Sequence, residues 1–168
     1  MLSNFDIERL AKKLDLPIVG VFSKDRLPEK PQIGSYYINL QNHNEGNGTH
    51  WVFAKVYCDD DRENTYALDK NGKKLYRCGA LYFDTFGVNM PKEVEDFLKP
   101  FKPVPYNNRH IQNINSTECG WYNIALDYSL EHKKHSDTYL EDYEKFLALW
   151  SDKPTKNLTL LKSFFKPL

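Results

Sequence analysis

The sequence predicts an α+β protein, with helices at both ends of the chain and a central, mostly antiparallel sheet packed by those helices. Apolar residues recur at helical spacing near the beginning and in three stretches after residue 118, whereas short runs in the middle are aromatic and β-branched. With 168 residues, the chain fits one domain spanning 1–168 and can bury a substantial core without disulfides or metals.

The first predicted element is an amphipathic helix. Ser3 can cap it, and Pro17 follows the end of its pattern. Its apolar residues at helical spacing are Ile7, Leu10, Ala11 and Leu14. A short apolar run at 18–22 and a proline-punctuated loop at 25–31 come next.

The middle of the chain predicts strands. Their composition places them at 34–40, 50–58 and 80–84, with one more at 109–114. A loop is expected at 42–48 and an acidic turn at 59–64, and the tight-turn dipeptide Asn71-Gly72 predicts a hairpin between 65–68 and 73–76. His50 would then begin a strand and Asp84 would end one.

The last part of the chain predicts helices. A short helix is expected at 91–98, and a longer one from Cys119 to about Glu131, with Ser116 or Thr117 as candidate caps. Cys119 would then lie in the first helical turn. Two further helical patterns carry, in order, Leu140, Tyr143, Leu147 and Trp150, then Leu158, Leu161 and Phe165.

Charge and cysteine content exclude several classes of protein. Lysine plus arginine equal aspartate plus glutamate at 23 each, so no global charge favours nucleic acid or an anionic membrane. Three cysteines without a C-x-x-C spacing argue against a disulfide framework and a zinc site, and they favour a reducing compartment. The polar beginning and the lack of a long apolar stretch predict a soluble, intracellular protein.

Cys119 is the candidate nucleophile. Helix amides that point at a first-turn sulfur, together with a neighbouring imidazolium, favour a thiolate. The alternative is a small buried cysteine packed at a helix start.

His50 is the candidate base, because it begins a strand after a glycine-rich loop. Its alternative is an ordinary surface histidine, as expected for His43, His110, His132 and His135.

Two further residues complete a candidate site. Asp84 can accept a hydrogen bond from the imidazole, and Gln112 can donate one to an oxyanion together with the Cys119 amide. A turn-forming aspartate and a polar loop residue are the alternatives. Each alternative is the better reading of its residue alone, but the joint occurrence of the set favours a thiol hydrolase.

Several motifs together resemble the adenovirus maturation protease (adenain) family and its relatives in virophages and other double-stranded DNA viruses. Their order is more distantly similar to that of SUMO- and ubiquitin-like-protein proteases. The motifs are His50-Trp51, Tyr82-Phe83-Asp84-Thr85-Phe86-Gly87, Gln112 and Glu118-Cys119-Gly120. With Gly20-Val21-Phe22 and Leu27-Pro28, the resemblance extends from the first helix to about Tyr128, roughly three quarters of the chain.

The resemblance implies an adenain-like cysteine peptidase fold, with the nucleophile at the N-terminus of the central helix. Carried over by position, Cys119 is the nucleophile, His50 the general base and then acid, Asp84 the orienting acid and Gln112 an oxyanion donor. The family's preference for Gly-Gly or apolar-x-Gly sites implies a narrow substrate cleft beside Trp51 and Gly120, although a strand tryptophan is more often part of a core. No metal or other cofactor is expected.

The resemblance also implies partners and a place of action. It predicts a monomeric viral endopeptidase that cleaves capsid or core precursors, in the virion and beforehand in the host cytoplasm or viral factory. Adenain is activated by a disulfide-tethered peptide and by DNA, but this chain has no cysteine between Asp84 and Cys119 to accept such a tether. Activation by a peptide or DNA therefore stays open, as do a deconjugating protease and a catalytically silent binding module of the same fold. Glu118 would oppose a thiolate unless it points to solvent.

Overall fold

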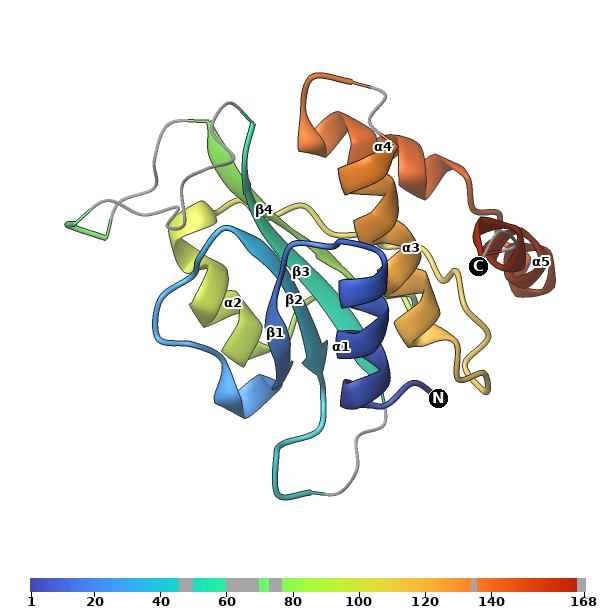
Figure 1. The fold of residues 1–168 in the computed structure, drawn as a ribbon, viewed down its shortest axis with the longest axis horizontal. Coiled ribbons are helices and arrows are strands. Elements are labelled where there is room, and N and C mark those ends of the chain that lie inside the picture. The colour runs from blue at the N-terminus through green and yellow to red at the C-terminus, as the bar shows by residue number, and fades with distance from the viewer. Residues whose placement is uncertain (46–49, 60–69, 73–76, 134–135, 166–168) are drawn as a thin grey trace.

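The computed structural model describes residues 1–45, 50–59, 70–72, 77–133 and 136–165. It is an α+β fold in which helices pack on a four-stranded mixed sheet (Figure 1). The strands are β1 (Ile18–Ser23), β2 (Gly34–Asn39), β3 (Trp51–Cys58) and β4 (Cys78–Phe83). The helices are α1 (Asn4–Lys13), α2 (Lys92–Leu98), α3 (Cys119–His132), α4 (Tyr139–Ala148) and α5 (Pro154–Phe164), with short 3-10 helices at Lys24–Arg26 and Lys99–Phe101.

The strands follow one another in space in chain order. The pairs β2–β3 and β3–β4 are antiparallel, whereas β1 runs parallel to β2. The predicted α+β class with a mostly antiparallel sheet is therefore confirmed. β1 is parallel to β2 because the connection at 24–33 returns the chain to the edge of the sheet at which β1 begins, so that both strands run in the same direction.

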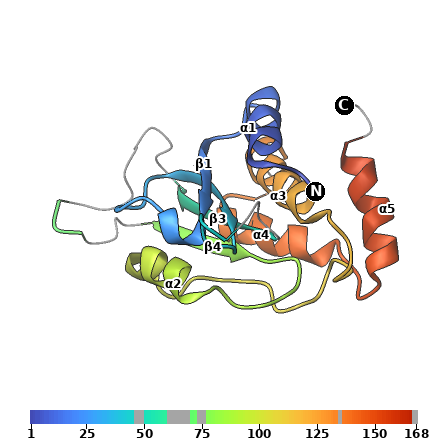
Figure 2. The ribbon, with the colours of Figure 1, turned by 90° about the horizontal axis from the view of Figure 1, so that it is seen from below.

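Helices cover both faces of the sheet (Figure 2). The residues of α1, α3, α4 and α5 form one core with one face, and α2 forms a second core with the other. Side chains alternate along β3, so Phe53 enters the first core and Val52 the second. Burial on both faces explains why β3 is so rich in apolar residues in the sequence.

The predicted cap of the first helix is present. The Ser3 hydroxyl accepts from the Asp6 amide, and the Asp6 carboxylate accepts from the Ser3 amide, which makes a capping box. The caps predicted for the helix that begins with Cys119 are wrong. α3 begins after Glu118, and neither Ser116 nor Thr117 caps it.

The predicted strand at 109–114 is wrong, because this segment is irregular. The backbone amides of Ile111 and Gln112 both donate to the Thr85 carbonyl, so they bond to a turn and not to a strand edge. The two strands of the expected hairpin, at 65–68 and 73–76, lie outside the described residues. Most of the acidic turn at 59–64 and the end of the loop at 42–48 lie outside them as well.

The cysteine count led to a wrong prediction about disulfides. Cys58 and Cys78 form one across β3 and β4, where the strand register places them directly opposite each other. An odd count could not reveal this pairing, because it depends on register. Cys119 remains as a free, buried thiol. Among the described residues, none of the helices combines the length and the apolar composition that a membrane span requires.

Candidate active site

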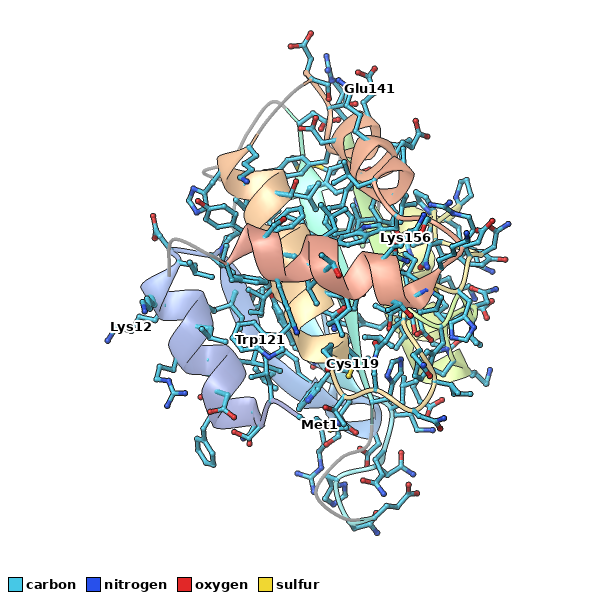
Figure 3. All side chains as sticks on the ribbon, turned by 90° about the vertical axis from the view of Figure 1, so that its right-hand side faces the viewer. Met1, Lys12, Cys119, Trp121, Glu141 and Lys156 are labelled. Atoms are coloured by element: carbon cyan, nitrogen blue, oxygen red, sulfur yellow. A yellow bond between two sulfur atoms is a disulfide. The ribbon has the colours of Figure 1, made fainter. Side chains whose placement is uncertain are left out.

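Three of the predicted site residues come from the ends of different elements. His50 directly precedes β3, Asp84 directly follows β4, and Cys119 is the first residue of α3. Because β3 and β4 are antiparallel, the beginning of β3 lies beside the end of β4. Figure 3 labels Cys119 at the beginning of α3, the helix that packs on β3. Gln112 lies in the irregular segment that leads into α3.

The His50 ring is fixed by Asp84 and Phe86. His50 Nε2 lies 2.7 Å from Asp84 Oδ1, and since a carboxylate only accepts, Nε2 is the donor. The Phe86 amide donates to the same carboxylate oxygen at 2.8 Å. The Phe86 ring stacks on the imidazole with centroids 4.2 Å apart and planes 8° apart. With Nε2 committed to Asp84, Nδ1 is the ring nitrogen left for the thiol.

The electrostatics of the site favour a charged imidazole. Burial lowers the pKa of His50, but hydrogen bonds to Asp84 and Cys119 raise it, and the net pKa is about 9. The buried sulfur has a second partner, because the Trp51 backbone amide points at Cys119 Sγ from 3.4 Å. An imidazolium and an amide donor both stabilise negative charge on sulfur.

Gln112 is held at three points. Its side-chain Oε1 accepts from the Thr85 hydroxyl at 2.6 Å, and its Nε2 donates to the Ser116 carbonyl at 3.0 Å. Its backbone amide donates to the Thr85 carbonyl. The residue is 1% exposed, and its side chain reaches the segment just before the N-cap of α3. The amide is therefore ordered by contacts on both of its ends.

Sequence reasoning missed several residues that support this site. Buried Asn107 accepts from the Asp84 amide through Oδ1 and donates to the Asp84 carbonyl through Nδ2, so it clamps the backbone of the acid. Asn107 also donates to the Arg109 carbonyl. Asn107 and Asp84 lie 23 positions apart, so no local pattern reveals their contact. In the sequence, only the Phe-Gly that follows Asp84 indicated a specialised turn.

The turn after Asp84 requires a glycine at position 87. Its φ is +72°, and a Cβ there would lie 2.7 Å from the backbone carbonyl of Arg109. Its amide donates to the Asp84 carbonyl, which closes the turn that carries Asp84, Thr85 and Phe86. The backbone at this turn needs a glycine both for its conformation and for the close approach of residue 109.

Glu118, the residue before Cys119, lies beside α5. It lines a pocket with Trp121 at the start of α3 and with residues at α5, namely Leu158, Leu161, Lys162 and Phe165. Among the described residues its buried Oε2 has no hydrogen-bond partner. Burial raises the pKa of the neighbouring Tyr122 to about 12, and the charge of Glu118 adds to that effect.

The two residues expected to bind substrate are both buried. Trp51 belongs to the core, and its indole Nε1 donates to the Leu2 carbonyl at 2.8 Å. A Cβ at Gly120 would lie 3.0 to 3.4 Å from atoms of the Leu2 side chain. The N-terminal segment thus packs beside the beginning of α3, and a substrate role of Trp51 and Gly120 stays a prediction.

The other described histidines have partners away from the thiol. His43 bonds to Asp25 and Arg26, and His132 bonds to the carbonyls of Leu14 and Asp15. His110 packs edge-on against Phe86. In the part of the chain that the structure describes, no group of three or more His, Cys, Asp or Glu residues is arranged to hold a metal ion.

Comparison with known proteins finds similarity among solved structures only at the level of the fold. No protein-family model matches the chain, and no curated protein matches it. Among solved structures it is similar to the crystal structure of the Se-Met ASFV pS273R protease, with 17% sequence identity and a TM-score of 0.44. That alignment covers 90% of this chain and 68% of the other.

Proposed function

We propose that this protein is a cysteine peptidase. The observation that carries the proposal is the buried arrangement in which Asp84 holds Nε2 of His50, and in which the free Cys119 thiol, beside the Trp51 amide, acts on the same imidazole and raises its pKa. A nucleophile, a base and a group that orients the base are the minimum set for thiol catalysis. The thiol alone, at the start of a helix, would not support the same conclusion.

In the first half of the reaction, the Cys119 thiolate attacks the carbonyl carbon of a peptide bond. The carbonyl electrons move to oxygen, where the Cys119 amide and the Gln112 side chain donate hydrogen bonds. The Cys119 amide is available because the first N–H groups of α3 have no partner within the helix. The His50 imidazolium then gives its proton to the leaving amine as the carbon–nitrogen bond breaks, which leaves a thioester on sulfur.

In the second half, His50 acts as a base. It takes a proton from water as the water oxygen attacks the thioester carbon, and the carbon–sulfur bond then breaks. The products are a carboxylic acid and the thiolate, with the proton back on His50. Asp84 keeps the imidazole in one orientation through both steps, because its Oδ1 holds Nε2.

The finer assignment rests on the motifs that resemble the adenain family. On that basis the enzyme is a viral endopeptidase that cleaves capsid or core precursors at glycine-containing sites during virion maturation. It acts in the virion, and beforehand in the host cytoplasm or viral factory. The substrates are the precursor proteins, and an activating peptide or DNA is a further candidate partner.

Cleavage of a co-expressed capsid precursor tests the assignment. The wild-type chain should process the precursor, and Cys119→Ala should abolish processing while its circular dichroism is unchanged. His50→Gln should reduce processing to the same level. His43→Gln is the matched control, because His43 also bonds to an aspartate but has no thiol partner among its described contacts; it should process normally.

Three outcomes would redirect the assignment. Normal processing by Cys119→Ala would exclude Cys119 as the nucleophile. A wild-type protein that ignores the precursor but is labelled by a probe ending in a ubiquitin-like C-terminus would be a deconjugating protease. A Cys119 thiol that fails to react with an alkylating reagent at neutral pH would indicate a binding module without activity.

A further inference from the structure

Two consecutive residues hold two different parts of the proposed catalytic machinery. Asp84 accepts from His50, and the next residue, Thr85, donates its hydroxyl to Gln112 Oε1 at 2.6 Å. The Thr85 carbonyl also accepts from the amides of Ile111 and Gln112. Thr85 is fully buried, so its contacts are shielded from water. The turn after β4 therefore fixes the base through one residue and Gln112 through the next.

The contacts of Gln112 determine which way its amide points. The Ser116 carbonyl cannot donate, so the group that faces it at 3.0 Å must be Nε2. Oε1 then faces Thr85, and the Thr85 hydroxyl must be the donor of that hydrogen bond. A flipped amide would place two acceptors against each other at Ser116. The orientation is thus a consequence of the network.

We propose that Thr85 is a positioning residue for the oxyanion donor Gln112, an inference that rests on the proposed function. An amide group is planar, and one of its two N–H bonds is used by Ser116. Anchoring Oε1 by Thr85 and one N–H by Ser116 fixes the plane and hence the direction of the second N–H. A donor that is oriented before the reaction stabilises the developing oxyanion without reorganisation.

The Thr85→Val substitution separates the hydroxyl from the volume of the side chain. Valine keeps the branched shape but leaves Gln112 Oε1 buried without its donor, so the amide loses one of its two side-chain anchors. With an internally quenched apolar-x-Gly-Gly peptide as substrate, we expect kcat to fall about 10- to 100-fold with KM unchanged. Thr85→Ser retains the hydroxyl and should stay within about threefold of the wild type.

Alkylation of Cys119 by iodoacetamide distinguishes positioning from general damage. This reaction forms a carbon–sulfur bond and expels iodide, and it develops no oxyanion. The Thr85 side chain does not contact His50 in the described network. The rate at which iodoacetamide alkylates Cys119 in Thr85→Val should therefore be within about twofold of the wild-type rate. The Thr85→Val/Gln112→Ala double variant should be no slower in peptide cleavage than Gln112→Ala alone.

Three results would overturn the positioning role of Thr85. They are an unchanged kcat in Thr85→Val, equal losses of cleavage and alkylation, and further slowing of Gln112→Ala by Thr85→Val. If Thr85→Val does not fold, Thr85→Ala gives the same comparison with a smaller side chain. A wild-type protein that is alkylated but cleaves no probe would overturn the proposed function, and this inference with it.

Discussion

His50 gains its partners on folding, and this links its protonation to stability. Its pKa rises from the ordinary 6.5 to about 9, because the hydrogen bonds to Asp84 and Cys119 outweigh the lowering by burial. Since the folded state binds this proton more tightly, the resulting stabilisation is fully present below pH 6.5 and is lost as the pH rises through about 9. The same proton is the one that the proposed mechanism gives to the leaving amine.

This linkage predicts a pH-dependent stability difference. The free energy of unfolding of the wild type minus that of His50→Gln should be largest below pH 6.5 and should fall by on the order of 3 kcal/mol above pH 9. Urea unfolding across this range measures the difference. In the NMR titration, the His50 midpoint should lie near 9 in the wild type and lower in Asp84→Asn. A stability difference that is constant with pH would contradict the arrangement.

Gly87 allows a direct test of the turn that carries Asp84. Gly72 has a similar φ of +79°, but a Cβ added there would meet nothing within 4 Å, whereas Gly87 lies against the backbone of residue 109. Gly72→Ala should cost about 1 kcal/mol for the left-handed backbone alone. Gly87→Ala should cost about 3 kcal/mol or more, because a clash with backbone is added.

Urea unfolding of the two alanine variants gives both free energies, and peptide cleavage shows where the damage lies. Only Gly87→Ala should lose activity, since it displaces the turn that carries Asp84 and Thr85. Equal losses of stability would show that residue 109 moves aside freely.

At the level of elements, a buried charge network fixes α3, the helix that begins with Cys119, on the sheet. Lys55 in β3 donates to Ser35 in β2 at 2.7 Å and to Asp127 in α3 at 2.9 Å, and it pairs with Glu131 at 2.9 Å. Tyr37 donates to the other oxygen of Asp127. Asp127 lies eight positions after Cys119 on the same helix, so this network sets where the helix begins relative to His50.

Removal of Lys55 should therefore be costly. Lys55→Met leaves Asp127 and Glu131 without their buried cation, and we expect a loss of about 3–5 kcal/mol in the free energy of unfolding. Lys92→Ala, which breaks the exposed Lys92–Asp96 pair on α2, is the matched control and should cost less than about 0.5 kcal/mol. Chemical denaturation checks both. A Lys55→Met variant as stable as Lys92→Ala would mean that the network contributes nothing to the packing of α3.

The elements that sequence analysis predicted well are those with local signals. α1 has a capping box and a single apolar face, and β3 has a long, mostly apolar run, so neither depends on distant partners. Lys55 was hidden inside that run, because its partners lie on β2 and α3. The segment 109–114 has the composition of a strand, but its backbone amides bond to the Thr85 carbonyl, which no local pattern reveals.

The candidate site shows the same division. His50, Asp84 and Cys119 stand at the ends of elements, where functional residues are expected, so their positions in the sequence were informative. Asn107 and Thr85 act on the backbone or side chain of a distant residue. Nothing near Asn107 marks it, and the motif that contains Thr85 does not reveal its contact with Gln112. The Cys58–Cys78 disulfide depends on the register of β3 and β4, which the intervening residues do not specify.

Across the whole molecule, β3 and β4 carry different features at their two ends. One end of the pair meets His50 and Asp84, and the other end carries the Cys58–Cys78 disulfide. Extended strand separates Trp51 from Cys58 by roughly 23 Å. The cross-link acts on the unfolded chain by closing a loop with a sequence separation of 20. Its effect on stability is therefore separable from its effect on the site.

Reduction should accordingly destabilise the protein without slowing the proposed chemistry. Closing a loop of this length contributes about 3 kcal/mol in the chain-entropy treatment, so the Cys58→Ser/Cys78→Ser variant should lose about that much free energy of unfolding. Its kcat on the internally quenched peptide should match the wild type, because β3 and β4 stay paired by their backbone hydrogen bonds. Parallel urea unfolding and peptide cleavage make the comparison. The wild type under a thiol reductant should behave like the double variant. If instead the double variant keeps the wild-type free energy of unfolding but has a lower kcat, the far end of the strand pair controls the site.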